Sequence, residues 1–360
     1  MKPSVYLQLL DSSLRYLAVN PRNQAVLDRG EVVFEAPILS DRQVSNRPLV
    51  EARLDALVRE KKWRQAKAHI LLMDDFVVIK EEAVPPQLKM EEVQNYLNLQ
   101  MNDTIRIPFD KPVFEYEILG RAENEIRVVL IAYPGEFIEE YKRILKAARL
   151  KPELADVSCL SLYRLAEDQG LISKEEGEHT LILQLDPYSM NMSMFHRDQP
   201  TFSRDSYSEV LAEMWVQSKD AGWRWRHSDI DRDLMLNEQF DEIDRFISFY
   251  SNTFLGESDQ IAQFILSGSY PDLSHAKGLL ERRFNLEPQL LELPQELDQS
   301  FATLYGLSLK KKTRSGKQKK ALEQQDKQMK QEQKQQGKKQ KKQKKEKKAK
   351  VEMQEEVADD

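Results

Sequence analysis

The sequence of 360 residues contains a single cysteine, Cys159. A lone cysteine cannot form a disulfide within the chain, which is typical of proteins of a reducing compartment. No stretch approaches the roughly 18 apolar residues that a membrane-spanning helix needs. The apolar run near the N-terminus is interrupted at Asp11, which argues against a signal peptide. These absences predict a cytoplasmic protein.

The signatures of several enzyme classes are also missing. The sequence has no Gly-x-x-x-x-Gly-Lys-Ser/Thr segment, so it is not a P-loop enzyme, and no Gly-x-Ser-x-Gly segment. Its five histidines show no ligand spacing with each other or with the cysteine, so we expect no metal site.

Charge is distributed unevenly along the chain. Residues 1–309 carry 35 basic and 51 acidic side chains, whereas residues 310–350 carry 19 basic and 4 acidic ones. The last ten residues carry 5 acids and no base. The basic segment is mostly lysine and glutamine with almost no large apolar side chain, so burial cannot offset the entropy of ordering it. We predict a folded acidic body and a disordered tail at 310–360 with an acidic tip.

A pattern of strand, turn and strand near residue 5 recurs near residue 181. Apolar runs at 5–10 and 14–19 flank a polar turn, and runs at 181–185 and 190–195 flank Asp186-Pro187. Each copy is followed by mixed helices and strands, including helices predicted at 205–218 and 237–254. The repetition predicts an α/β fold of two halves.

Both hairpins and one later turn resemble the nucleotide motifs of the actin-like ATPase superfamily. There, each half opens with a hairpin whose Asp-x-Gly turn holds phosphates and magnesium. Here Gln8 and Leu10 stand at the first Asp and Gly positions, and Gln184 and Asp186 at the second. Leu266-Ser267-Gly268-Ser269 matches the superfamily's adenosine motif with one glycine fewer. The resemblance implies a nucleotide pocket at Gln8, Leu10, Asp11, Ser12, Ser13, Arg15, Gln184, Asp186, Gly268 and Ser269.

The departures from these motifs have physical consequences. A leucine in place of glycine puts a side chain where backbone must approach phosphate. A glutamine in place of aspartate removes the charge that holds the hydration shell of magnesium, and Asp186 adds a negative charge where phosphates would lie. We therefore predict a vestigial pocket with no catalytic residue and no cofactor. Weak binding of ATP and magnesium stays open as the alternative.

Within the superfamily, the chain most closely resembles the type IV pilus assembly proteins of the PilM family, relatives of the cell-division protein FtsA. The segment Ile107-Pro108-Phe109 followed by Tyr116 is similar to one typical of the pilus proteins. The resemblance implies an actin-like, ribonuclease-H-like duplicated two-half fold with an inserted subdomain. The implied parts are a first-half core at 1–47 and 151–180, an inserted subdomain at 48–150, and a second half at 181–309.

The resemblance also implies a function, a non-enzymatic cytoplasmic scaffold of a type IV pilus or competence-pilus assembly machine, peripheral to the inner face of the membrane. Family members bind the cytoplasmic N-terminal segment of PilN, a single-span membrane protein, in a groove of the first half. By resemblance, this groove lies between the first hairpin's domain and the inserted subdomain. We name Ile107, Pro108 and Phe109 as its candidate lining. Other pilus assembly proteins are further implied partners.

Three other functions stay open: an actin-fold ATPase, an actin-like membrane tether of cell division, and a nucleic-acid-binding protein. The lysine- and glutamine-rich C-terminus lacks the apolar face of a tether. Segment 310–350 suits anionic lipid, and we favour lipid over nucleic acid because the acidic body repels phosphate. We interpret the aromatic and basic cluster Trp223–His227 as packing or partner contact, and the row Met190, Met192 and Met194 as core rather than a copper site.

Overall fold

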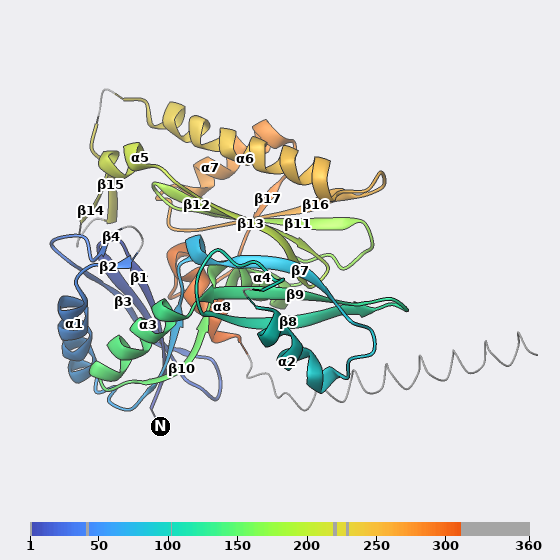
Figure 1. The fold of residues 1–360 in the computed structure, drawn as a ribbon. Helices are drawn as coiled ribbons and strands as arrows, with labels where there is room; N and C mark the ends of the chain where they lie inside the picture. The colour runs from blue at the N-terminus through green and yellow to red at the C-terminus, as the bar shows by residue number, and fades with distance from the viewer. Residues whose placement is uncertain (1, 41–42, 102, 219–221, 228–229, 311–360) are drawn as a thin grey trace, which may run out of the picture. The chain divides into compact units, whose positions relative to one another are not determined.

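The computed structural model describes residues 2–40, 43–101, 103–218, 222–227 and 230–310. The predicted disordered tail from residue 311 onward lies outside these ranges. The two predicted hairpins each seed a five-stranded sheet, and a three-stranded sheet forms a separate subdomain (Figure 1). No helix among the described residues is long and apolar enough to cross a membrane.

The first sheet has the strand order β10-β6-β1-β2-β3. The strands β1, β2 and β3 form an antiparallel meander. The strand β6 pairs in parallel with β1, and β10 pairs in parallel with β6. Every residue of β2 is buried, because helices cover both faces of the sheet. The strands are β1 (Ser4–Leu10), β2 (Ser13–Val19), β3 (Val26–Val33), β6 (Lys67–Leu71) and β10 (Lys151–Asp156).

Alternate residues of the first hairpin bury their side chains on opposite faces, as the period of a strand requires. Val5, Leu7 and Leu9 pack with α1 (Arg47–Glu60) and α3 (Gly135–Ala147). Tyr6, Leu17 and Val19 pack with α8 (Ala302–Ser308). The helix α1 begins where the Asn46 side chain accepts a hydrogen bond from the Leu49 amide, with Pro48 in its first turn, an arrangement that favours helix initiation.

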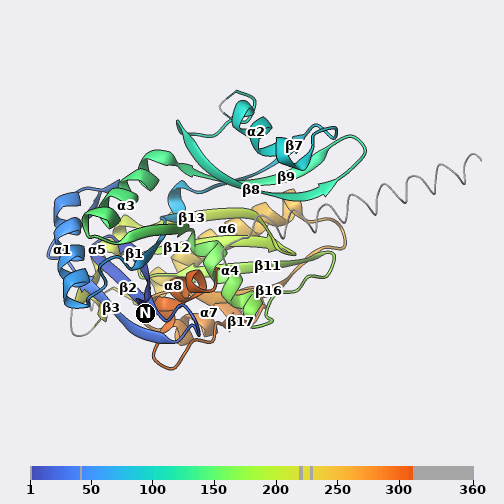
Figure 2. The same ribbon diagram turned by 90° about the horizontal axis from the view of Figure 1, so that it is seen from below.

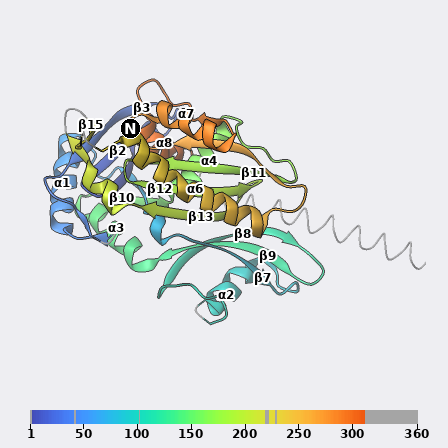
Figure 3. The same cartoon turned by 90° about the horizontal axis from the view of Figure 1, so that it is seen from above.

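The second sheet repeats the first, with the order β13-β12-β11-β16-β17. A meander again carries two parallel strands beside its first strand. The helices α6 and α7 cover one face (Figure 3), and α4 packs between the two sheets. The elements are β11 (Glu178–Leu185), β12 (Ser189–His196), β13 (Gln199–Tyr207), β16 (Gln260–Ser267), β17 (Pro288–Leu290), α4 (Ser158–Asp168), α6 (Arg232–Phe254) and α7 (Leu273–Phe284).

The inserted subdomain is a sheet of order β7-β9-β8 with α2 on its outer face (Figure 2). Its own core joins Val93 and Leu97 of the helix to Val128 and Leu130 of the central strand. The elements are β7 (Val78–Val84), β8 (Pro112–Arg121), β9 (Ile126–Pro134) and α2 (Met90–Gln100).

The structure gives this subdomain narrower bounds than the predicted 48–150. The strand β6 lies inside the first sheet, and α3 packs on α1, so the chain leaves the first half only between about residues 73 and 134. The second sheet likewise begins at Glu178, slightly before the predicted 181. The apolar periodicity of α1 predicts a helix but does not indicate whether that helix belongs to the first half or to the inserted subdomain.

The helix predicted at 205–218 is confirmed only for the six residues of α5 (Glu209–Met214), whereas the one predicted at 237–254 is confirmed within α6. The strand β13 runs on to Tyr207, a short helix follows, and then a hairpin pairs Trp215 with Trp225. Trp223 and Trp225 stand two residues apart in the second strand of this hairpin, and aromatics in that spacing fit a strand better than a helix. The remaining elements are β4 (Leu39–Ser40), β5 (Gln43–Val44), α5 (Glu209–Met214), β14 (Trp215–Ser218), β15 (Gly222–Trp225), and the short 3₁₀ helices η1 (Asp74–Phe76) and η2 (Gln299–Phe301).

The methionines Met190, Met192 and Met194 are at most 1% exposed and pack in the second core. The interpretation of this row as core is therefore confirmed. The cluster around Trp223 also packs: its ring contacts that of Tyr188 at 5.5 Å between centroids, and Trp225 contacts Trp215 at 5.2 Å.

Candidate functional site

The turns of the two hairpins approach each other across a narrow cleft, because the duplicated sheets place them at equivalent positions. The cleft encloses about 80 Å³. Seven of the ten residues predicted for the nucleotide pocket line it, whereas Ser13, Arg15 and Gly268 do not. The seven are Gln8, Leu10, Asp11, Ser12, Gln184, Asp186 and Ser269.

Gly268 lies next to the cleft and packs against the backbone of Leu185. Its φ of +126° lies in a region that side chains rarely adopt, and an added Cβ would collide with the carbonyl oxygen of Leu185. Glycine is needed here because two backbone segments touch. The position therefore serves the packing of the turn against β11.

The lining of the cleft is strongly acidic. Five aspartates contribute to it, and the described residues around it include no lysine or arginine. The Tyr188 hydroxyl of the second half forms a hydrogen bond with Asp11 of the first. The five aspartates are Asp11, Asp74, Asp75, Asp186 and Asp205.

Asp186 closes the second turn from within. One carboxylate oxygen accepts hydrogen bonds from the backbone amide of Ser269 at 2.7 Å and from its hydroxyl at 2.5 Å. The other oxygen accepts a hydrogen bond from the Gln184 side-chain amide at 2.8 Å. The Ser269 amide is therefore already hydrogen-bonded to the Asp186 carboxylate, although in such a turn a bound anion would use this backbone donor.

Arg15 is directed away from the cleft. Its guanidinium lies 3.3 Å from the Glu31 carboxylate and donates a hydrogen bond to the carbonyl of Ser300 at 2.8 Å. Burial opposes ionisation of Glu31, but the charge of Arg15 and hydrogen bonds from Ser13 and Gln217 outweigh it, so the pKa of Glu31 lies below its usual value. Gln217 belongs to the second half, and its bond to Glu31 at 2.8 Å joins the two halves.

The residues at these turns do not fit a magnesium nucleotide. Small-molecule sites usually enclose about 300–1,000 Å³, well above the volume between the turns. The acidic lining repels phosphate, the only arginine of the motif is engaged elsewhere, and the Ser269 amide is already bonded. A wider opening of about 770 Å³ adjoins the cleft, but its lining is aromatic and acidic, with Arg226 as its one cation among the described residues.

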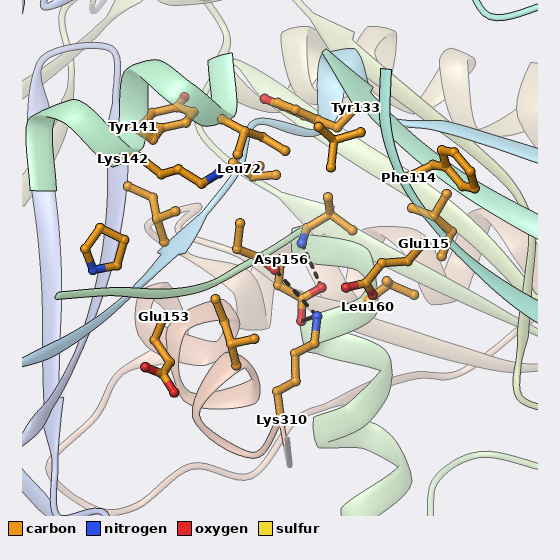
Figure 4. Close-up of a pocket in the computed structure, with 18 of the residues that line it drawn as sticks. Leu72, Phe114, Glu115, Tyr133, Tyr141, Lys142, Glu153, Asp156, Leu160 and Lys310 are labelled. Carbon is orange, nitrogen blue, oxygen red and sulfur yellow. Dashed lines mark hydrogen bonds and ion pairs between the residues drawn. The ribbon is translucent and has the colours of Figure 1, made fainter. Parts of the chain in front are cut away.

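A second, mainly apolar groove lies between the first sheet and the inserted subdomain (Figure 4). It encloses about 320 Å³, and its walls come from β10, α3 and α4 on one side and from β8 and β9 on the other. The apolar lining residues include Ile70, Leu72, Val113, Phe114, Ile131, Ile138, Leu154 and Leu160.

Charged groups are concentrated at one place in this groove. The Asp156 carboxylate is 2% exposed and lies 2.7 Å from Arg164 and 3.3 Å from the Lys310 ammonium. Figure 4 shows Lys310 reaching toward Asp156 from below, with Glu115 on the facing wall. Lys142 lines the groove further along and pairs with Glu139 at 2.6 Å.

Ile107, Pro108 and Phe109 lie outside the lining of this groove. Ile107 packs instead against the core of the inserted subdomain. Sequence reasoning missed the groove residues because they come from strands and helices far apart in the chain. The apolar character of Leu154 and Leu160 signals burial in general and does not identify a groove.

Comparisons with known proteins identify the family and the fold of the chain. A family model described as "Type IV pilus assembly protein PilM" matches residues 18–215. The solved structure described as "PilM-PilN type IV pilus biogenesis complex" superposes with a TM-score of 0.67 at 16% identity, over 85% of this chain and 97% of that one. This likeness confirms the predicted duplicated actin-like α/β fold.

More distant structures are also similar. The ethanolamine utilization protein EutJ from Carboxydothermus hydrogenoformans gives a TM-score of 0.49 at 9% identity, over 86% of this chain and 90% of that one. MreB5 of Spiroplasma citri bound to ADP gives 0.46 at 10% identity, over 87% and 97%. No curated protein matched the sequence.

Proposed function

This chain belongs to the PilM family of type IV pilus assembly proteins, and we propose that it is a cytoplasmic scaffold of a type IV pilus or competence-pilus machine. Its partner is the cytoplasmic N-terminal segment of a PilN-like single-span membrane protein. The supporting observation is the apolar groove between the first sheet and the inserted subdomain. A groove of this kind suits an extended peptide with apolar side chains. Binding such a partner would hold the protein at the inner face of the membrane.

We further propose that the protein works without turning over ATP. The acidic, narrow cleft and the internal hydrogen bonds of Asp186 support this proposal. The predicted contacts of 310–350 with anionic lipid, favoured over nucleic acid, concern a segment that lies almost entirely outside the described residues and stay predictions. So does the expected contact with other pilus assembly proteins.

The partner proposal is tested by titration with a synthetic peptide. The probe is a labelled peptide covering the cytoplasmic N-terminal segment of PilN from the same organism, and the full chain is the titrant. We expect saturable binding with a Kd of about 1–50 μM, typical of a short segment that loses conformational freedom on binding. A scrambled peptide of the same composition is the control. The proposal would be refuted if the two peptides bound with equal affinity or if neither peptide bound.

We expect no ATP turnover and, because the cleft is narrow and acidic, no change of the protein's melting temperature on adding nucleotide. A ligand that binds only the native state raises stability by RT ln(1 + [L]/Kd), so even a millimolar Kd gives a measurable rise at about 10 mM magnesium ATP. The measurement is a thermal unfolding series with magnesium chloride alone as the control, paired with an assay of phosphate release. Magnesium-dependent phosphate release would overturn the proposal that ATP is not turned over, whereas stabilisation without release would mean that the cleft binds nucleotide without hydrolysing it.

A further inference from the structure

Glu115 brings a carboxylate into the groove from the wall formed by the inserted subdomain. It lies on β8, lines the groove, and is exposed to solvent. Figure 4 shows its side chain directed across the groove toward Asp156 and Lys310. In the free protein, water therefore solvates this charge. The groove around it is mainly apolar, with Phe114 and Leu160 among its lining residues.

The other charged side chains of the lining already have partners of opposite charge. The Glu115 carboxylate, in contrast, forms no ion pair and accepts no hydrogen bond within the part of the chain that the structure describes. It is thus the one uncompensated charge among the described lining residues. The existing pairs are Asp156 with Arg164 at 2.7 Å and with Lys310 at 3.3 Å, Glu153 with Lys67 at 3.3 Å, and Lys142 with Glu139 at 2.6 Å.

A peptide that fills the groove would remove water from Glu115. Burying a charge without a partner is costly, whereas burying it with a counter-ion and hydrogen bonds offsets much of that cost. The two cations of the described lining are engaged. The Lys310 ammonium contacts the Asp156 carboxylate and the Ala155 carbonyl, the latter at 3.5 Å, and Lys142 pairs with Glu139. The compensating charge therefore has to come from the occupant.

The charge of the groove as a whole points the same way. Its described lining holds three acidic and two basic side chains, so an occupant with one positive charge complements it. A lysine or arginine side chain also suits the apolar walls, because its aliphatic stem can pack on them while its charged end reaches the carboxylate.

We propose that the partner's N-terminal segment carries a basic side chain that docks between the two walls of the groove and pairs with Glu115. This inference rests on the proposed function, because it names the chemistry of the occupant of the same groove. The apolar side chains of the segment supply most of the affinity. The pair sets the register, since a segment shifted along the groove would place an apolar side chain against the carboxylate. Glu115 is then a specificity-determining residue.

A double-mutant cycle tests this pair. PilN peptides in which each basic residue in turn is replaced by norleucine are titrated against the full chain and against Glu115→Gln. One of these replacements should weaken binding about tenfold or more in the native chain, but less than about threefold in Glu115→Gln. The matched control is Glu153→Gln, which removes the same charge from the same lining. There the replacement should cost as much affinity as in the native chain.

The outcomes separate the two proposals. Failure of the unmodified peptide to bind would overturn both the proposed function and the pair. Binding that no norleucine replacement weakens by more than about threefold would overturn the pair alone. So would a loss of the same size in the native chain and in Glu115→Gln. Because Glu115 is exposed in the free protein, we expect its variant to keep the melting temperature of the native chain.

Replacement of Lys310 tests whether the chain's own lysine neutralises Glu115 instead. Lys310→Met removes the ammonium, and Asp156 keeps its contact with Arg164. With one repelling charge fewer beside the docked cation, the unmodified PilN peptide should bind about twofold to fivefold more tightly. The control Lys142→Met removes the same charge further along the groove and should change affinity less than about twofold. Unchanged or weaker binding by Lys310→Met, or equal gains in both variants, would overturn the proposal.

Discussion

The variant Leu160→Glu should weaken binding of the PilN peptide by at least about a hundredfold while the protein stays folded. Leu160 lies on α4, lines the groove near Asp156, and is partly exposed. In the free protein a glutamate there keeps contact with water. A docked peptide would bury this charge close to the Asp156 carboxylate, which already engages Lys310 and Arg164, and this costs several kcal/mol. Isothermal titration with the full chain measures the loss.

The matched control is Leu99→Glu, the same substitution on α2 outside the groove. Leu99 is 77% exposed, so we expect no change in affinity. A second groove variant, Val113→Glu, places a charge on the facing wall, where the side chain is 49% exposed. It should reproduce the loss even if Leu160→Glu proves unstable. If both groove variants fold and bind within about threefold of the native chain, the peptide binds elsewhere.

The two halves of the fold were predictable because each opens with a hairpin of buried apolar runs. Those runs satisfy the strand period on both faces, as β2 shows with every residue buried. The residues 205–218 contain helix formers and aromatics together. There the pairing of Trp215 with Trp225 across the hairpin decides the structure, and such a contact cannot be inferred from local periodicity.

The candidate site was predictable only in part, for a similar reason. The motif positions predicted that Gln8, Leu10, Gln184 and Asp186 lie near one another, and in the structure all four line one cleft. The direction of Arg15 was not predictable, because it depends on Glu31 and on the distant carbonyl of Ser300. The groove depends on where the edges of two separate sheets come to lie, which is a property of the folded chain.

The variant Asp74→Asn should be more stable than the native protein, and its advantage should be larger at pH 8 than at pH 5. Asp74 is partly buried in the cleft, where it accepts a hydrogen bond from the Ser158 amide at 2.9 Å and another from the Ser158 hydroxyl. Burial raises the pKa of this carboxyl to about 7, and the charges of Asp75 and Asp186 act in the same direction. Asparagine keeps the shape and the acceptor oxygen but carries no charge at any pH.

The variant should be the more stable protein because folding and protonation of Asp74 are linked. The pKa of Asp74 is higher in the folded state than the value of 3.8 expected for the unfolded chain, so the folded state binds the proton more tightly. The stability of the native protein therefore falls as pH rises from about 4 to 7, and the loss is complete above pH 7. At 1.36 kcal/mol per pKa unit, removing this loss should raise the free energy of unfolding by about 2–4 kcal/mol at pH 8.

Urea unfolding at pH 5, 6.5 and 8 measures this difference, and the native protein's own pH profile is the reference. The gain should be smaller at pH 5, where only part of the interval between the two pKa values has been crossed, and should grow until the pH passes about 7. Because the variant also removes one negative charge from the cleft, magnesium ATP is added in a parallel series. Equal stability of the two proteins at pH 8 would mean that Asp74 ionises without penalty, and that water reaches the cleft between the two turns.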